Sequence, residues 1–404
     1  MNKEQARIEF EEYRKKGIKI DMTRGKPCKE QLDLSLGMMD ILNSDSNYMD
    51  TANIDVRNYG KMDGIDECKE LLSPLLGTPI ENILIFGNSS LNAMYDQIAR
   101  SYAFGVMGMP PFSRQGEIKW LCPVPGYDRH FGITEHFGFT LIPVPMDENG
   151  PDMDRVEELI KDSSVKGIWC VPKYSNPSGI TYSDEVVARF AKLKPAAKDF
   201  RVYWDNAYAV HDLYEEGDRL LNMFEEARKY GNEDLFYIFA STSKITFPGS
   251  GVAALGASEA NLKDIKGHLK YQTIGYDKIN ELRHALFFKD YEGVLSHMRK
   301  HADILRPKFD VVVETLEKEA DGLASFSKPK GGYFVLLKVN GKAREVVERC
   351  KSAGIILTEA GATHPYHKDE SNSYIRIAPS CVDLDDLRVA MHILCLAIRL
   401  EANG

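Results

Sequence analysis

The chain has 404 residues, enough for two domains or for one large domain with an appendage. Its apolar content of 43% and charged content of 27% are those of an ordinary soluble globular protein. The 51 basic residues are outnumbered by 60 acidic ones, and the net charge of −9 argues against a general nucleic-acid binder.

The two ends of the sequence bear on its location. The opening stretch MNKEQARIEFEEYRKK is charged and helical in period, without the apolar core of a signal peptide, so we expect a cytoplasmic protein. The apolar stretch VAMHILCLAI near the other end is too short to span a bilayer, and no membrane partner is expected. The 7 cysteines are scattered without a CxxC pair, so neither disulfides nor a metal site are predicted.

Residues 1–50 are predicted to form an N-terminal arm, and residues 51–285 a large α/β domain. Seven apolar segments of that domain read as strands that alternate with helical patterns: residues 82–87, 118–123, 139–145, 165–172, 199–205, 235–241 and 251–258. Several are apolar at successive positions, which is typical of strands covered on both faces. The alternation predicts a mainly parallel seven-stranded sheet wrapped by helices.

Residues 286–404 are predicted to form a smaller α/β domain. A helical pattern runs over roughly residues 262–320, with a break expected at Pro307 because proline cannot donate the helical hydrogen bond. A long helix is expected to cross the boundary between the two domains. Further elements are then predicted: strands at 332–339, 354–360 and 374–380, a helix at 342–353 and a final helix from Leu384.

Two polar clusters expected at strand ends are an anion site and an amide. Ser89 and Ser90 precede a helix predicted to begin near Leu91, so their hydroxyls and the free N–H groups of its first turn suit a phosphate. The alternative is that Ser90 only caps the helix. Asn176, in VPKYSNPSG, opens a turn after the strand 165–172, where open α/β sheets bind ligands.

Two further clusters are a carboxylate with a phenol and an isolated amine. Asp205 ends a buried strand, where it needs a cationic partner unless it only caps the next turn, and Tyr208 shares its loop. Lys244 stands among small residues and hydroxyls, including those of Ser241 and Ser243. The four clusters together fit a ligand with a phosphate, a ring oxygen, a basic ring nitrogen and an aldehyde, which is pyridoxal 5'-phosphate.

The order of these motifs over nearly the whole chain resembles the class I/II aminotransferases, which are fold-type I pyridoxal-phosphate enzymes. The likeness is carried by NPSG at Asn176, DNAY at Asp205, STSK at Lys244 and YIRIAPS at Arg376. The runs MTRGKP and GNSSLNAMYD look closer still to the class Ic aspartate aminotransferases. One feature departs from the pattern, because no arginine follows Lys244 at the distance where most class I members clamp the phosphate.

The resemblance implies a role for each matching residue. Lys244 is expected to form a Schiff base with the cofactor and then to move a proton, while Asp205 keeps the pyridine nitrogen protonated. Arg376 is expected to bind the substrate α-carboxylate, with an exposed arginine on a short strand as the alternative. The predicted catalytic residues are Lys244, Asp205 and Tyr208, the other cofactor-binding residues are Ser89, Ser90, Tyr127, Asn176, Ser241, Ser243 and Tyr59, and Asn176 is also placed near the substrate.

The resemblance also implies partners and substrates. Tyr59 matches the tyrosine that usually reaches the neighbouring subunit's phosphate, so we expect a homodimer with shared active sites. The expected substrates are an L-amino acid, with aspartate and glutamate favoured, and a 2-oxo acid. Arg24, in DMTRGKP, is predicted to meet the distal carboxylate unless it is an ordinary surface charge, and Arg283 is the second choice.

Other functions of the same cofactor residues stay open. One is a different pyridoxal-phosphate reaction, such as β-elimination or decarboxylation, and another is an aminotransferase with a non-acidic donor. A third is a cofactor-sensing binding protein, although such regulators carry an N-terminal DNA-binding domain that the N-terminal arm of about 50 residues is too short to supply. The half-reaction that turns an amino acid into an oxo acid distinguishes these possibilities.

Overall fold

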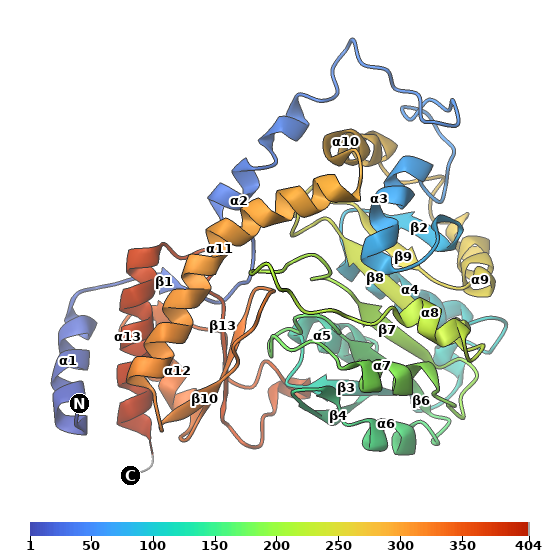
Figure 1. Cartoon of the computed structure of the whole chain (residues 1–404). Coiled ribbons are helices and arrows are strands. Elements are labelled where there is room, and N and C mark those ends of the chain that lie inside the picture. The colour runs from blue at the N-terminus through green and yellow to red at the C-terminus, as the bar shows by residue number, and fades with distance from the viewer. Residues whose placement is uncertain (403–404) are drawn as a thin grey trace.

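The computed structural model describes residues 1–402, and its largest sheet in that range has eight strands in the order β2-β9-β8-β7-β6-β3-β4-β5 (Figure 1). Strands β4, β3, β6, β7 and β8 run parallel, whereas β9 is antiparallel to both β8 and β2. The mainly parallel sheet is therefore confirmed. The strands are β2 Ile83–Phe86, β3 Lys119–Val124, β4 Thr140–Asp147, β5 Gly150–Pro151, β6 Val165–Cys170, β7 Arg201–Asp205, β8 Phe236–Ser241 and β9 Ala253–Gly256.

Seven of these strands are the seven predicted ones, and β5 is the addition. It has only two residues, Gly150 and Pro151, which pair antiparallel with the end of β4. A strand this short has no periodicity to read, so only its pairing reveals it.

Helices cover the large sheet on both faces. In β7, Val202 and Trp204 belong to one buried cluster, and Tyr203 between them belongs to another. Successive side chains of a strand point to opposite faces, so both faces of β7 are buried, as its unbroken apolar run predicts. The first cluster includes side chains of α3 Asp66–Leu76, α6 Met153–Leu159, α7 Asp184–Ala191, α8 Met223–Arg228 and α10 Lys278–Phe288; the second includes those of α4 Ser90–Phe104, α5 Asp128–His136 and α9 Glu259–Leu269.

A separate buried cluster surrounds a smaller antiparallel sheet, ordered β10-β11-β13. Its elements are β10 Ala324–Phe326, β11 Val335–Val339, β13 Tyr374–Ile377, α12 Ala343–Ser352 and α13 Leu384–Glu401. Helix α1 (Lys3–Lys15) lies along α13 (Figure 1), and Lys3 Nζ donates to the Ala402 carbonyl at 2.6 Å. The arm continues through β1 (Ile20–Asp21), which pairs parallel with β12 (Ile355–Ile356), and α2 (Lys29–Asp33).

The long helix α11 runs from Tyr291 to Glu319 without interruption, so the predicted break at Pro307 is wrong. Its first half is buried in the large-sheet core through Val294 and Met298, and its second half in the small-sheet core through side chains such as Phe309. A helical proline costs about 3 kcal/mol, whereas each fully buried apolar side chain contributes about 1.5–3 kcal/mol. Burial at both ends therefore outweighs the missing hydrogen bond.

The division of the chain at residues 50/51 and 285/286 stays a prediction. Over the described residues 1–402, no helix combines the length and the apolar character needed to cross a membrane.

Candidate active site

One edge of the large sheet collects the polar side chains. Strands β6, β7 and β8 are parallel, and β2 shares their direction because β9 is antiparallel to both β2 and β8. The segments that follow these strands therefore meet at one edge, as predicted. One cavity there is lined by Ser89, Ser90, Tyr127, Asn176, Asp205, Tyr208, Ser241, Ser243 and Lys244. Every residue predicted to bind the cofactor except Tyr59 lines this cavity.

The anion site is built at the start of α4. The Ser89 hydroxyl accepts the Leu91 N–H at 3.2 Å, so Ser89 is the helix cap. Ser90 is the first residue of the helix, and the alternative that Ser90 caps it is therefore wrong. The N–H groups of this first turn open toward the cavity and suit an anion.

A second loop closes the anion site from the side of Lys244. Ser243 Oγ donates to the Asn88 carbonyl at 2.8 Å, and Ser241 Oγ donates to Ser243 Oγ at 3.2 Å. Gly251 backs this contact, and a Cβ there would lie 3.0 Å from both the Asn88 carbonyl oxygen and the Ser243 nitrogen. The two loops can approach this closely because position 251 is a glycine.

Asp205 is buried at the end of β7, and its two carboxylate oxygens have different surroundings. Oδ2 lies 3.0 Å from His130 Nε2, whereas Oδ1 has no hydrogen-bond partner within residues 1–402. The His130 ring stacks on Trp169 with ring centroids 4.6 Å apart. One oxygen is thus held in place, and the other is left for a group that enters the cavity.

His130 is the main site residue that the sequence did not predict. It lies in the first turn of α5, three residues after Tyr127, and its ring meets the Tyr127 ring edge-on at 4.9 Å. A histidine close behind a predicted cofactor-stacking tyrosine was the available signal. Its partner Asp205 is 75 residues away, and only the packing of α5 on the sheet brings the two together.

Lys244 projects into the same cavity. Its ammonium nitrogen lies 4.9 Å from the centroid of the Tyr208 ring, and within residues 1–402 it has no ion pair. Burial lowers the pKa of Lys244, although the charge of Asp205 acts in the opposite direction. A lowered pKa increases the fraction of neutral amine, which is the nucleophilic form.

A second cavity opens directly from the first, because both are lined by Tyr127, Asn176, Tyr208 and Lys244. Arg376 on β13 lines the second cavity and is only 8% exposed, so the alternative of an exposed arginine is wrong. The small sheet thus supplies one wall of a cavity whose floor belongs to the large sheet.

The Arg376 guanidinium is held by several acceptors but keeps one donor open. Nη1 donates to Asp128 Oδ1 at 3.3 Å and to Asn176 Oδ1 at 3.4 Å. Nη2 donates to the Thr23 carbonyl at 3.2 Å and to Thr358 Oγ1 at 3.1 Å, while Nε has no partner within the described residues. A planar guanidinium fixed in this way is suited to a carboxylate.

Arg24 is an exposed side chain that lines the second cavity together with the buried Arg376, and two further exposed cations that the sequence did not single out, Lys26 and Arg129, also line it. The adjacent Gly25 makes this possible, because a Cβ there would lie 2.4 Å from the Phe334 ring, against which Arg376 also packs. The backbone at Gly25 therefore lies close against the Phe334 ring.

Two predicted residues lie elsewhere. Arg283 is on α10 and lines a separate small pocket with residues 249–252, away from Lys244 and Arg376. Tyr59 is 79% exposed on the surface of the chain. Within one chain, neither residue is brought to the cavity around Lys244.

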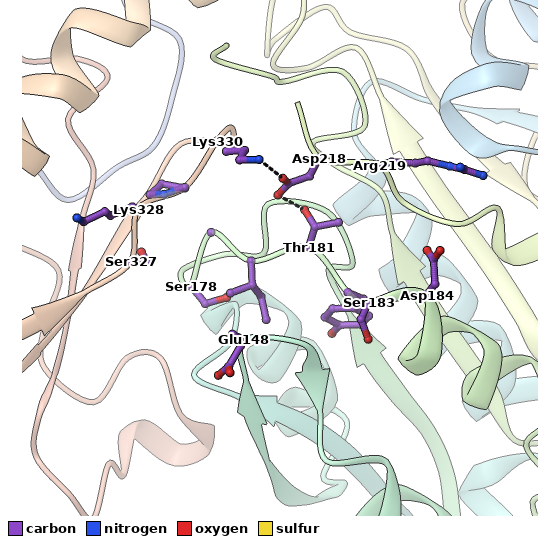
Figure 2. A pocket seen from close by; sticks show the side chains of 14 residues that line it. Glu148, Ser178, Thr181, Ser183, Asp184, Asp218, Arg219, Ser327, Lys328 and Lys330 are labelled. Atoms are coloured by element: carbon purple, nitrogen blue, oxygen red, sulfur yellow. Dashed lines mark hydrogen bonds and ion pairs between the residues drawn. The ribbon is translucent and has the colours of Figure 1, made fainter. Parts of the chain in front are cut away.

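A wider cavity of about 530 Å³ lies on the other side of the Asn176 turn, between the loop 178–184 and the loop 327–330 (Figure 2). Asp218 links its walls, because Lys330 Nζ lies 3.7 Å from Asp218 Oδ1 and Thr181 Oγ1 donates to Asp218 Oδ2 at 3.0 Å (Figure 2). It contains neither Lys244 nor Asp205 nor Arg376, so the predicted catalytic and substrate-binding residues lie in the other two cavities.

A parallel sheet with an amine and a tethered carboxylate at its carboxyl edge, facing a guanidinium that is fixed on a second, smaller sheet, is the arrangement expected of a fold-type I aminotransferase. The comparisons with known proteins lead to the same class. The chain belongs to the aspartate amino-transferase family, whose sequence model matches residues 2–404.

Individual relatives support this membership. An aspartate aminotransferase of Corynebacterium glutamicum is 45% identical over 403 residues, which cover 99% of this chain and 93% of the relative. The crystal structure of an aspartate transaminase from the same species superposes with a TM-score of 0.96 at 45% identity, covering 98% of this chain and 95% of that one. Thermus thermophilus LysN, an alpha-aminoadipate aminotransferase complexed with N-(5'-phosphopyridoxyl)-L-leucine, shares the fold at 19% identity, with a TM-score of 0.75 and coverage of 96% and 94%.

Proposed function

We propose that this aminotransferase uses pyridoxal 5'-phosphate to exchange amino groups between L-aspartate or L-glutamate and the corresponding 2-oxo acids. The observation that carries the proposal is the pairing of two adjoining cavities, one lined by Lys244 and Asp205 and the other by Arg376 and additional cations. The first suits the cofactor, and the second suits a dicarboxylate.

The residues of the first cavity fit pyridoxal 5'-phosphate. Among the described residues the buried Asp205 Oδ1 has no partner, and a protonated ring nitrogen would provide one. Ser89, Ser90 and the start of α4 fit the phosphate, and Tyr127 would stack on the ring. His130 holds Oδ2 of the Asp205 carboxylate at 3.0 Å, which would leave Oδ1 for the ring nitrogen of the bound cofactor.

The residues of this chain have separate tasks in the reaction. The cofactor, when bound, supplies an aldehyde and a ring that withdraws electrons from the substrate Cα. Lys244 would be the amine that holds the aldehyde, and once free it would be the base that takes a proton from the substrate Cα. Arg376 binds the α-carboxylate and fixes the Cα beside Lys244, and Asn176, which accepts from Arg376, orients both.

The charge of the second cavity favours a substrate with two carboxylates. Arg24, Lys26 and Arg129 line it, and within residues 1–402 none of their side chains is ion-paired or hydrogen-bonded. The lining acids are Asp128, already paired with Arg376, and Glu359. A surplus of unpaired cations in a protein of charge −9 attracts a dianion over a monocarboxylic amino acid.

The direct test of the proposal is the half-reaction of the purified holoenzyme with single amino acids. We expect aspartate and glutamate to convert the cofactor to its amine form and to release oxaloacetate and 2-oxoglutarate, with kcat/KM well above that for alanine or phenylalanine. Release of carbon dioxide or ammonia would indicate a decarboxylase or a lyase instead. A preference for alanine or an aromatic donor would overturn the substrate assignment.

In Arg24→Ala the distal carboxylate of aspartate loses its proposed partner inside a closed site. We expect this loss to weaken transition-state binding of aspartate by about 2–5 kcal/mol, which is measured as a fall in kcat/KM. Alanine never makes that contact and should be spared. The measurement is kcat/KM for aspartate and alanine in both proteins. Lys29→Ala, which removes an exposed lysine paired with Asp33 outside the cavity, is the control and should change neither value. Equal losses on the two substrates, or a selective loss in Arg129→Ala alone, would remove Arg24 from this role.

We also propose that the active form is a homodimer with Tyr59 reaching the partner's phosphate site. Tyr59, Tyr271 and Ile274 are 79%, 83% and 60% exposed, which is unusual for such large apolar side chains. Their loops adjoin, because a Cβ on Gly275 would lie 3.0 Å from the Gly60 carbonyl oxygen. Tyr276, just beyond, packs on Phe86 at the end of β2, so this surface lies beside the phosphate end of the cavity.

Sedimentation of the active enzyme is expected to give a dimer at assay concentrations. Tyr59→Phe should weaken cofactor retention, measured by dialysis and residual cofactor absorbance, more than it alters the choice of amino donor, because only a phosphate contact is lost. Tyr271→Phe, which removes a hydroxyl group from another exposed tyrosine of the same surface, is the control and should retain the cofactor like the wild type. A fully active monomer would refute the shared site.

A further inference from the structure

Buried side chains of α10 and α11 contact the turn that carries Lys244, residues 241–246. These side chains have no part in the proposed reaction. From α10, His284 Nε2 lies 3.0 Å from both Thr242 Oγ1 and Thr246 Oγ1, and its Nδ1 lies 2.8 Å from the Asn280 carbonyl oxygen. The same Thr242 hydroxyl accepts the Val252 N–H at 2.9 Å. The side chains of this turn are therefore fixed by α10.

The main chain of the turn is held by two histidines of α11. His297 Nε2 lies 3.0 Å from the carbonyl oxygen of Ile245, the residue directly after Lys244. His301, one helical turn further on, lies 3.1 Å from His297 through its own Nε2 and faces the same carbonyl. Both rings are almost completely buried, at 5% and 1% exposure, so the Ile245 carbonyl depends on them in place of water.

Gln31 of α2 supports the histidine pair from the N-terminal arm. The Cys28 N–H donates to Gln31 Oε1 at 3.0 Å, so the amide nitrogen of Gln31 must face His301, 2.9 Å from its Nδ1. The same nitrogen donates to the Tyr333 hydroxyl at 2.9 Å. His301 Nδ1 is therefore an acceptor, which places the ring proton of the neutral imidazole on Nε2. His297 Nε2 carries its own ring proton when it donates to the Ile245 carbonyl, so the two Nε2–H groups share that acceptor and do not bond each other.

Hydrogen bonding and not charge holds this network. Burial lowers the pKa of His301 to about 3 and lowers that of His297 as well, which favours the neutral form of both rings. The pair also lies where α11 passes from the large-sheet core, through Met298, to the small-sheet core, through Leu305. Gln31 follows Arg24 closely in sequence and belongs to the same arm.

We propose that His297, supported by His301 and Gln31, is a positioning residue that fixes the main chain at Lys244 and Ile245 relative to α11 and the N-terminal arm. It sets the direction in which the Lys244 amine enters the cavity, and it links that direction to α11 and to the N-terminal arm, which carries Arg24 of the second cavity. The inference rests on the proposed role of Lys244 as the amine that bonds the cofactor aldehyde.

The test compares two ligands on the full-length apoprotein. Covalent capture of pyridoxal 5'-phosphate requires the cavity and a correctly oriented Lys244, whose amine joins the aldehyde with loss of water. Pyridoxamine 5'-phosphate has no aldehyde, so its binding requires only the cavity. For His297→Phe we expect covalent capture of the aldehyde, followed by absorbance, to slow about 10- to 100-fold, the scale of a misplaced reacting group. Affinity for pyridoxamine 5'-phosphate should stay within about twofold, because the variant leaves the cavity wall intact.

Two further variants make the outcome decisive. His297→Gln, whose amide can reach the Ile245 carbonyl, should restore most of the capture rate, and His392→Phe, on α13 and away from the turn, should leave it unchanged. If His297→Phe does not fold, Gln31→Met is measured in its place and should show the same slow capture with unchanged pyridoxamine 5'-phosphate affinity. An unchanged capture rate, or equal losses with both ligands, would overturn the inference. Capture by Lys244→Ala at the wild-type rate would instead overturn the proposed function itself.

Discussion

Lys244→Ala is expected to abolish transamination while leaving the cofactor cavity able to bind pyridoxal 5'-phosphate without a covalent link. The amine both holds the aldehyde and moves the proton at Cα, and no other lysine lines the cavity around Asp205. The measurement is the half-reaction with aspartate, together with the cofactor absorbance before and after dialysis. Steady turnover with the absorbance of the wild type would contradict the assignment of Lys244.

The stability of this variant separates lost chemistry from lost folding. Burial lowers the pKa of Lys244 in the folded chain, so below that pKa the charged amine works against folding. This cost is complete below the folded-state pKa, and it declines to zero as the pH rises from that value to the ordinary pKa of a lysine. Removal of the amine should therefore leave the melting temperature at neutral pH unchanged or higher. Lys244→Arg, which keeps a cation but cannot join the aldehyde, is the control and should be equally inactive.

Asp205→Asn is expected to keep the fold and to reduce kcat by two to four orders of magnitude, the scale of a lost proton-holding group. The amide has the shape of the carboxylate and can still meet His130, so the cavity should remain. It cannot balance a protonated ring nitrogen, so the cofactor would withdraw electrons from Cα less strongly. The measurement is kcat and kcat/KM for aspartate, with the pH dependence of the cofactor absorbance as a second readout.

A buried carboxylate outside the cavity provides the control for this change. Asp199 is completely buried and pairs with Lys166 at 2.7 Å, and it lines neither active-site cavity. Asp199→Asn should lower stability, because breaking a buried ion pair costs about 3–5 kcal/mol, and should leave kcat near the wild-type value. Near-normal activity in Asp205→Asn would show that another group protonates the ring or that protonation is not required.

The sequence by itself determined the large sheet and the side chains at its edge. The seven longer strands could be read from apolar segments, several of them unbroken, and Asn176, Asp205 and Lys244 each lie at the end of such a segment or within a few residues of it. These features are local, because a strand that is buried on both faces is apolar along its length and polar residues occur only at or after its end. Their meeting at one edge then follows from the parallel direction of the strands.

Only the tertiary structure decided which distant residues complete the site. His130 reaches Asp205 across 75 residues, and Thr358 Oγ1 donates at 3.0 Å to the Thr23 carbonyl, 335 residues earlier, beside Arg24. Likewise, α11 continues through Pro307 because its two halves are buried in different cores. None of these outcomes leaves a local pattern, because each depends on packing between elements that are separated by long loops. The order of the site residues along the chain can therefore be predicted from the sequence, whereas the contacts that orient their side chains depend on long-range packing.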